Sequence, residues 1–254
     1  MNINALLFDL NGVVYIDDKA VPGAAEAIEY IDKKGIPHAF VTNNTRNSIA
    51  SLEKKLSELG LPIDPDKIIS PAKIAIDLLK ERNAKCFPVI NDNILPDFKE
   101  FICYDTDAEY ILIGDYGDNW DYKLYNKIFN MVMNGAKVIA LHKGRFWQAK
   151  EGLRIDIGAY ITGLEYAAGI EAEAVGKPEK AFFEAAVKDL QVDKSQIAMI
   201  GDDVISDIGG AQNCGLKGIL VKTGKYRKEH VEKSGIKPDL TIDSVDKIID
   251  ALEL

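Results

Sequence analysis

Four short apolar runs, each ending in polar residues, are the feature that most constrains the fold of this chain. They are ALLFD (5–9), HAFVTNNT (38–45), IAMIGDD (197–203) and GILVKTG (218–224). Continuous apolar runs of this length are typical of strands buried on both faces of a parallel sheet. Patterns that predict helices lie between or beside the runs, over 23–35, 48–60, 179–190 and 206–215. This alternation predicts an α/β fold with a doubly wound, Rossmann-like parallel sheet.

The middle of the chain has an alternation of its own. It predicts strands over 86–90, 109–116 and 137–142, and helices over 95–101 and 122–135. Polar residues that could form a site occur only before residue 46 and after residue 175. This distribution predicts a core domain of residues 1–79 and 173–254, into which an α/β cap domain of residues 80–172 is inserted.

The composition excludes several classes of partner. A net charge of −9 argues against nucleic acid or an anionic membrane, but not against a small anionic substrate. The three cysteines are scattered, without the spacing of a zinc site or a disulfide framework. No apolar run approaches the roughly 18 residues of a membrane helix, and residues 1–12 lack the basic segment of a signal peptide. We therefore expect a cytoplasmic protein that binds neither nucleic acid nor membranes.

Acidic residues gather where the predicted strands end. Asp9 closes the first run, and Asp202, Asp203 and Asp207 lie in GDDVISD (201–207). Ligands of such sheets bind beyond the carboxyl ends of the strands, so these acids are expected at one edge. They would repel one another there, and Mg²⁺, which takes oxygen ligands, would relieve the repulsion. A solvated turn with an acidic helix N-terminus explains GDD alone, but it does not account for Asp9 at the same edge.

Three further residues suit a phosphoryl group. Thr42 and Asn43 follow the second run, where a hydroxyl, an amide and backbone N–H groups can bind phosphate oxygens without adding charge. Lys177 precedes Pro178, a residue typical of helix starts, and its cation could pair with both Asp9 and a phosphate. Each signal alone is compatible with a polar turn or a solvated side chain, so the prediction depends on their combination.

These motifs, in their order along the chain, resemble the four motifs of the haloacid dehalogenase superfamily. They are DLNG (9–12), TN (42–43), GKP (176–178) and GDDVISD (201–207). The position of the insertion resembles the subgroup with a large α/β cap, which includes the nitrophenyl phosphatases and NagD-type phosphatases. The resemblance extends along the whole chain. It implies a phosphatase that acts on small phosphorylated substrates, and related proteins suggest a homodimer formed through the cap.

The resemblance also implies a role for each site residue. Asp9 would be the nucleophile that forms an aspartyl-phosphate. Mg²⁺ would be held by Asp9, by the backbone carbonyl of Asn11 and by Asp202. Asp203 and Asp207 would orient waters or the loop around the metal. The phosphoryl group would be held by Thr42, Asn43 and Lys177.

Asn11 departs from the family pattern. Most members have an acid at this position, which protonates the leaving group and later activates water, a contribution of roughly 10²–10⁴ in rate. The amide of Asn11 has no proton to exchange. One phosphatase of the same subgroup also has a non-acidic residue here, and it cleaves phosphoramidate and pyrophosphate bonds, whose leaving groups need less help.

Three hypotheses account for Asn11. The chain is an enzyme of such labile phosphate bonds, an Asp-to-Asn variant of an ordinary phosphomonoesterase, or a catalytically weak phosphate-binding protein. A receiver domain that is phosphorylated on Asp is an alternative of another class, because receivers also use Mg²⁺, Thr and Lys. In receivers the Lys comes last, whereas Lys177 precedes Asp202 here, and this chain is too long for a lone receiver.

The segment HKGRFWQAKEG (142–152) mixes Lys143, Arg145 and Lys150 with two aromatic residues. Three interpretations stay open for it: a contact with the substrate's leaving group, a solvated loop, or a dimer contact.

Overall fold

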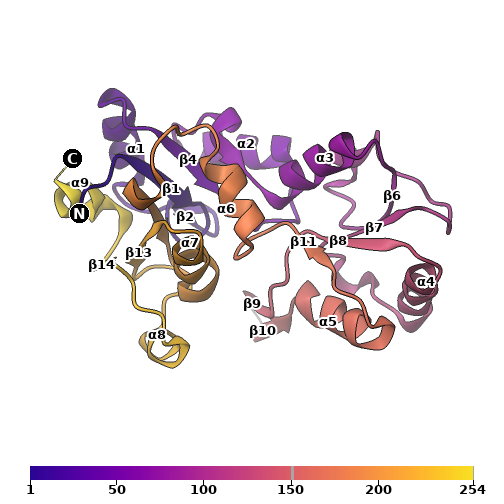
Figure 1. Ribbon diagram of the computed structural model, residues 1–254. Helices are drawn as coiled ribbons and strands as arrows, with labels where there is room; N and C mark the ends of the chain where they lie inside the picture. Colours follow the sequence, from indigo (N-terminus) through magenta and orange to yellow (C-terminus); the bar gives the residue numbers. More distant parts are fainter. Residues whose placement is uncertain (150–151, 254) are drawn as a thin grey trace. The chain divides into compact units, whose positions relative to one another are not determined.

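The structure, a computed structural model, describes residues 1–149 and 152–253 of the chain (Figure 1). The chain folds into two compact units. The first, here called the core unit, comprises Met1–Thr42, Ser51–Ile69 and Lys177–Leu254, and the second, the cap unit, comprises Asn43–Ala50 and Ser70–Gly176. The domain boundaries expected from the sequence stay a prediction; residues 70–79 and 173–176 pack with the cap unit.

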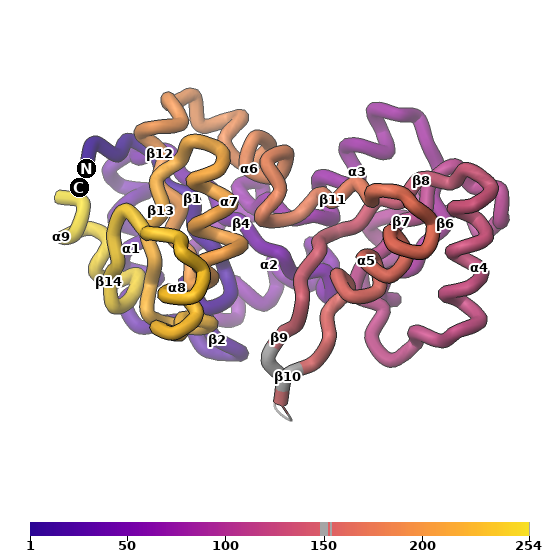
Figure 2. Tube along the Cα trace, turned by 60° about the horizontal axis from the view of Figure 1, so that its bottom comes forward, coloured from indigo at the N-terminus to yellow at the C-terminus, as the bar shows by residue number. Residues whose placement is uncertain are grey.

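A six-stranded parallel sheet in the order β14-β13-β12-β1-β4-β5 forms the centre of the core unit. In chain order its strands are β1 (Ala5–Asp9), β4 (His38–Val41), β5 (Ile68–Ile69), β12 (Ile197–Gly201), β13 (Lys217–Val221) and β14 (Leu240–Ile242). β1 lies between β12 and β4, with Phe8 opposite Ile200 and Asp9 opposite Val41. Figure 2 shows β13, β12 and β1 side by side. The predicted α/β fold with a parallel core sheet is confirmed.

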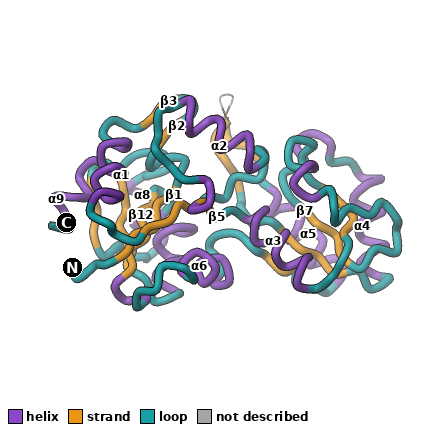
Figure 3. Tube along the Cα trace, turned by 90° about the horizontal axis from the view of Figure 1, so that it is seen from above, coloured by secondary structure: helices purple, strands orange, loops and turns teal. Residues whose placement is uncertain are grey.

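Helices cover both faces of this sheet, with α1 and α6 on opposite sides of β1 and β12 in Figure 3. The α-helices that lie wholly in the core unit are α1 (Ala24–Lys33), α6 (Lys180–Val187), α7 (Gly210–Asn213), α8 (Lys228–Ser234) and α9 (Ile248–Leu252). Most of α2 (Ile49–Glu58) also belongs to it. Smaller elements are the ribbon of β2 (Tyr15–Ile16) and β3 (Lys19–Ala20), and 3₁₀ turns at Pro65–Lys67, Lys194–Gln196 and Val245–Lys247.

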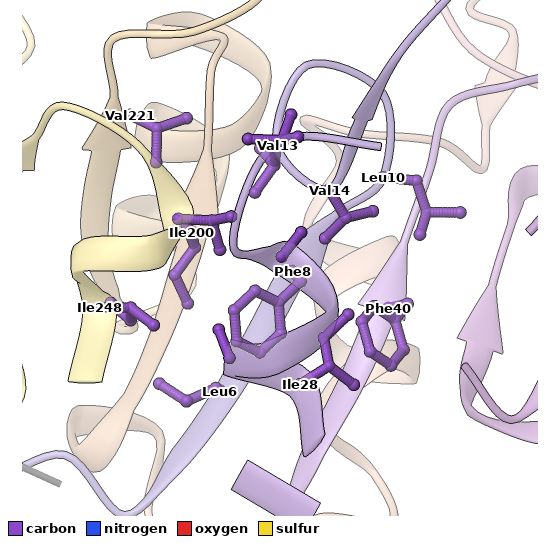
Figure 4. Close-up of a cluster of buried hydrophobic side chains, with 14 of the residues drawn as sticks. Leu6, Phe8, Leu10, Val13, Val14, Ile28, Phe40, Ile200, Val221 and Ile248 are labelled. Carbon is purple, nitrogen blue, oxygen red and sulfur yellow. The ribbon is translucent and has the colours of Figure 1, made fainter. Parts of the chain in front are cut away.

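The apolar runs of the sequence explain why these strands are buried. Leu6 and Phe8 of β1 join one apolar cluster with Phe40 of β4 and Ile28 of α1 (Figure 4). Leu7, which points to the other face, is equally inaccessible. Because successive strand residues alternate between faces, β1 is buried on both sides. This burial leaves its carboxyl end, at Asp9, as the place where a polar group can act.

The cap unit has its own parallel sheet, in the order β11-β8-β7-β6. Its strands are β6 (Cys86–Val89), β7 (Tyr110–Ile113), β8 (Lys137–Ala140) and β11 (Glu173–Ala174), and its α-helices are α3 (Pro71–Glu81), α4 (Tyr122–Met133) and α5 (Ile157–Ala168). Short 3₁₀ turns occupy Leu95–Phe98 and Gly117–Asn119. An antiparallel ribbon pairs β9 (Phe146–Ala149) with β10 (Gly152–Ile155).

Two predicted helices differ from the observed elements. Residues 95–101 contain only one 3₁₀ turn. The predicted helix over 206–215 begins earlier, as the π-helical turn η5 (Val204–Gly209), and continues as the short α7. The turn is wide because the Asp203 carbonyl accepts from the N–H groups of Asp207 (3.0 Å) and Ile208 (3.3 Å).

The segment 142–152 is partly strand, since β9 lies within it. Lys143 pairs with Glu165 at 2.9 Å, and the Trp147 ring lies 4.9 Å from the Arg46 guanidinium carbon, measured to the ring centroid. Lys150 lies outside the described residues. No helix in the described part of the chain has the length and apolar character needed to cross a membrane.

Candidate active site

Three buried carboxylates meet at the carboxyl edge of the core sheet. Asp9 is the last residue of β1, Asp202 follows β12, and Asp207 lies in η5. One carboxylate oxygen from each lies within 4.8 Å of the others. Only 6%, 3% and 1% of these residues is exposed, respectively. Three ionised carboxylates that are this close together and shielded from water destabilise the folded protein unless cations compensate their charge.

Lys177 supplies one of those cations. Its Nζ donates to Asp9 Oδ1 at 2.5 Å and to Asp207 Oδ1 at 2.7 Å, and Lys177 is itself buried. Burial lowers the pKa of the ammonium, but Asp207 and Asp9 together outweigh burial, so that its pKa is raised. Lys177 therefore stays charged, and it holds Asp9 and Asp207 in fixed positions.

The cluster is still short of positive charge. Burial raises the pKa of Asp9 to about 6, against the lowering effect of Lys177 and with a further increase from Asp207. The pKa of Asp202 is raised well above its usual value, first by burial and then by Asp9 and Asp207. Both shifts mean that ionising these groups costs free energy in the folded protein, a cost that a bound cation would remove.

The donor set fits a hard divalent cation. Asp207 has both oxygens engaged, Oδ1 by Lys177 and Oδ2 by the Asp203 N–H at 3.0 Å. Asp9 binds Lys177 through Oδ1, and Asp202 accepts the Lys225 N–H through Oδ2 at 2.6 Å. Asp202 thus has a second oxygen for a metal and Asp9 has one oxygen that Lys177 does not hold, whereas Asp207 positions Lys177 and the loop.

Asp203 has a structural role at the start of η5. Its Oδ1 accepts from the N–H groups of Ile205 (3.0 Å) and Ser206 (3.1 Å), as an N-terminal cap does. Its Oδ2 lies 3.5 Å from Lys225 Nζ. Burial raises the pKa of Asp203, but Lys225 and the two backbone donors lower it by more, so the net shift is downward. Asp203 therefore remains ionised and keeps the turn in place.

Three backbone N–H groups in the turn after β1 donate to the same carbonyl. The N–H groups of Val13, Val14 and Tyr15 donate to the Leu10 carbonyl at 3.4, 3.0 and 3.2 Å. Among the residues that the structure describes, none of these donors turns to the carbonyl of Asn11. Asn11 is exposed, and its carbonyl is consistent with the predicted metal ligand.

Thr42 and Asn43, two of the three predicted phosphate ligands, fall in different units. Thr42, nearly inaccessible at 2%, follows β4, and its N–H donates to the Ile69 carbonyl at 3.1 Å. Asn43 is the next residue in the chain and is half-buried, but it belongs to the cap unit. Within the core unit, the structure thus brings together Asp9, Lys177, Asp202, Asp203 and Asp207.

Sequence reasoning missed Thr223 and Lys225. Lys225 touches both Asp202 and Asp203, and the Thr223 hydroxyl donates to the Gly12 carbonyl. A signal was present, because the fourth apolar run ends in KTG at the same sheet edge as Asp9. It was not interpreted because the groups that matter are a backbone N–H and a hydroxyl, which no charge pattern reveals.

Replacing Lys177 with methionine should strongly destabilise the core unit. Breaking a buried ion pair from one side typically costs about 3–5 kcal/mol, and we expect a loss of this size in the free energy of unfolding at pH 7.5. The loss should shrink at pH 5.5. Without the ammonium the folded-state pKa of Asp9, already raised by burial, rises further above its unfolded value, so protonation then favours the folded state.

Urea unfolding of Lys177→Met and of the matched control Lys180→Met checks this. Lys180 is exposed (69% of its side chain) and pairs with Glu184 on the helix surface, so its variant should stay within about 0.5 kcal/mol of the native chain. Equal losses in the two variants, or a Lys177→Met loss that grows on acidification, would contradict the assignment of Lys177 as the buried counter-ion.

Two family models match the chain. A model described as haloacid dehalogenase-like hydrolase matches residues 6–101, and a second, described as HAD-hydrolase-like, matches residues 174–248. Together they contain the three carboxylates and Lys177.

Similar proteins span nearly the whole chain. It is 38% identical over 248 residues to haloacid dehalogenase-like hydrolase domain-containing protein 2 of Bos taurus, covering 98% of this chain and 95% of that protein. It is 34% identical over 257 residues to phospholysine phosphohistidine inorganic pyrophosphate phosphatase of Xenopus laevis, covering 98% and 94%. The structure of p-nitrophenyl phosphatase from Archaeoglobus fulgidus superposes with a TM-score of 0.90 at 25% identity, covering 99% and 100%. The resemblance seen in the motifs is confirmed by these matches, and the chain belongs to the haloacid dehalogenase-like hydrolase family.

Proposed function

We propose that this chain is a Mg²⁺-dependent phosphohydrolase that acts on small phosphorylated compounds through an aspartyl-phosphate on Asp9. The observation that carries the proposal is the position of Asp9: it ends the central strand, and its carboxylate shares a buried edge with Lys177 and Asp202. The phosphatase names of the similar proteins support the same reaction class.

The reaction proceeds in two displacements. Asp9 Oδ1 is held by Lys177, so we assign Oδ2 as the atom that attacks phosphorus. The bond from phosphorus to the leaving group breaks, and the leaving group departs with the electron pair. Water then attacks the phosphorus of the aspartyl-phosphate, the P–Oδ2 bond breaks, and Asp9 and inorganic phosphate are regenerated. Splitting hydrolysis in this way replaces one difficult step by two easier ones.

The surrounding residues bind and orient the phosphoryl group. The Thr42 hydroxyl, the Asn43 amide and the Lys177 ammonium would hold its oxygens. When bound, Mg²⁺ supplies positive charge to the phosphoryl oxygens, and Asp9, the Asn11 carbonyl and Asp202 would hold it. Asp203 and Asp207 keep the loop and Lys177 in place through the contacts described above.

Asn11 favours substrates whose leaving group needs no proton from the enzyme. A phosphoramidate can carry the proton on its nitrogen, and pyrophosphate leaves more readily than an alkoxide. The similarity to a phosphatase named for phospholysine, phosphohistidine and inorganic pyrophosphate supports this class. A catalytically weak phosphate-binding protein is the second candidate, and Asn11 is also the observation that favours it. The third hypothesis is an Asp-to-Asn variant of an ordinary phosphomonoesterase.

A cytoplasmic homodimer is part of the same proposal. Phe146 and Ile155 face each other across the β9–β10 ribbon and are 46% and 68% exposed. An isolated two-stranded ribbon is marginally stable in water, and a second copy would cover this apolar pair. Light scattering that gives the 28.0 kDa of one chain at micromolar concentration would contradict the dimer.

A small substrate panel tests the proposed reaction. With Mg²⁺, the chain should release phosphate from phosphohistidine, phospholysine, pyrophosphate or p-nitrophenyl phosphate, and Asp9→Ala should release less than a tenth as much because the nucleophile is gone. The control is Asp18→Ala, since Asp18 is exposed, near in sequence and paired with Lys55 on the surface. Turnover by Asp9→Ala above a tenth of the native rate would remove Asp9 from the nucleophilic role. No release from any substrate, with tight binding of phosphate, would favour the binding protein.

Mg²⁺ should stabilise the folded protein, and more at pH 7.5 than at pH 5.5. Metal ligands must be ionised, and with a pKa of about 6 Asp9 is mostly protonated at the lower pH. Thermal unfolding with and without 5 mM Mg²⁺ measures this stabilisation as a rise in Tm, since a cation that binds only the folded protein stabilises it by mass action. Asp202→Asn should lose the shift and the surface variant Asp243→Asn should keep it. A shift that is the same at both pH values would argue against Asp9 as a ligand.

Asn11→Asp should change rates selectively. Alkyl phosphates leave as poor alkoxides, so a correctly placed acid should speed their first displacement by roughly 10²–10⁴. Phosphoramidates and pyrophosphate should gain less in that step. Single-turnover kinetics separate this step from hydrolysis of the aspartyl-phosphate, which a new base would assist for every substrate.

The matched control for this change is Asn11→Ser, which supplies no acid. If Asn11→Asp binds Mg²⁺ normally but cleaves no alkyl phosphate faster in a single turnover, the site was not lacking a proton donor. The binding-protein hypothesis would then gain support.

A further inference from the structure

The loop that follows β13 closes over Asp202. We call residues 223–225 (Thr-Gly-Lys) the β13 loop. The Lys225 N–H donates to Asp202 Oδ2 at 2.6 Å, a short bond to a buried carboxylate. This donor is a backbone group, so its direction depends on the path of the loop and not on a side-chain rotamer.

Two glycines let the β13 loop come this close. Gly12 has φ +98° and Gly224 has φ +55°, both in the region that favours glycine. A Cβ on Gly12 would lie 2.5 Å from Asp202 Cγ, and a Cβ on Gly224 would lie 2.6 Å from the Gly12 Cα. The turn after β1 and the β13 loop therefore touch each other with the Asp202 carboxylate against both.

Thr223 joins these two loops directly. Its hydroxyl donates to the Gly12 carbonyl, and the Gly12 N–H donates to the Tyr15 carbonyl at 2.7 Å. Gly12 is thus held at both ends. Because a trans peptide directs its C=O and N–H oppositely, the Asn11 carbonyl must point away from Tyr15. The sheet order β13-β12-β1 means that the Thr223 bond crosses the end of β12, where Asp202 lies.

We propose that Thr223 is a positioning residue that sets the Asp202 carboxylate and the Asn11–Gly12 peptide in the arrangement that binds the divalent cation. The inference rests on the proposed function, since it assigns Asp202 and the Asn11 carbonyl as ligands. Outer groups that orient metal ligands typically contribute 10–100-fold in metal affinity. The effect of Thr223 should therefore appear in the affinity for the cation itself, in the absence of any substrate.

Mn²⁺ is a suitable probe, because it accepts the same oxygen ligands as Mg²⁺ and its free ion gives an electron paramagnetic resonance signal. Titration of the full chain at pH 7.5, followed by competition with Mg²⁺, gives the dissociation constants of both ions. We expect Thr223→Val, which keeps the shape and loses the hydroxyl, to weaken both by about 10–100-fold. Thr223→Ser should restore most of the affinity.

Two controls separate position from charge and from general damage. Thr241→Val changes an exposed threonine in β14 of the same sheet and should leave the affinity unchanged. Lys222→Met removes an ammonium next to Thr223 in the sequence that pairs with Asp243 on the surface. It should bind the cation as tightly as the native chain, because the ion pair that it removes lies outside the site. Thermal unfolding without metal checks that each variant is folded, and Thr223→Ala is measured in parallel in case the valine variant is not.

The outcomes distinguish the inference from the proposed function. If the native chain binds neither Mn²⁺ nor Mg²⁺, the metal-dependent function fails and the inference fails with it. If the native chain binds both, and folded Thr223→Val or Thr223→Ala binds them equally well, only the inference fails. A loss in Lys222→Met as large as that in Thr223→Val would also overturn it, because the effect would then not belong to the hydroxyl.

Discussion

The ion pairs of Lys177 with Asp9 and Asp207 are the interaction on which the active edge of this protein depends. They keep an ammonium and two carboxylates in a place where water has little access, and each would be costly to bury alone. The contact also joins residues 168 positions apart in the sequence. One charge therefore fixes Asp9, the proposed nucleophile, the loop that carries the other acids and the entry to α6 at the same time.

The cluster divides its acids by the partners that each one has. The carboxylate oxygens of Asp207 and Asp203 are engaged by Lys177, by backbone N–H groups and by Lys225, so these two acids stabilise the conformation of the loop. Asp9 and Asp202 are less completely paired and are the ones whose pKa values rise. The difference in pairing, and not the residue type, separates the acids proposed for chemistry from those that support them.

The sequence alone predicts those parts of the structure in which burial is visible as a run of apolar residues. Four of the six core strands, β1, β4, β12 and β13, are predicted because each is an apolar run, and Asp9 and Asp202 because a polar residue at the end of such a run is conspicuous. Lys177 is predicted from its place before Pro178 at the start of a helix. The strands β5, β11 and β14, of two or three residues, are too short to form a pattern. The sequence pattern does not distinguish the π-helical turn at Val204–Gly209 from the start of an α-helix. The role of Thr223 depends on a carbonyl in another loop, which only the folded chain brings near.

The place of β1 between β4 and β12 has a consequence for synthesis of the chain. β4 is made 29 positions after the end of β1, counting from Asp9 to His38, whereas β12 begins only at residue 197. Until the ribosome has passed that point, one edge of the buried strand β1 has no neighbour, and its N–H and C=O groups remain open to pairing with other chains. The residues of the cap unit, 43–50 and 70–176, are all made during this interval. The nascent core is therefore exposed to aggregation at this stage, and the part of the chain from residue 197 onward ends that exposure.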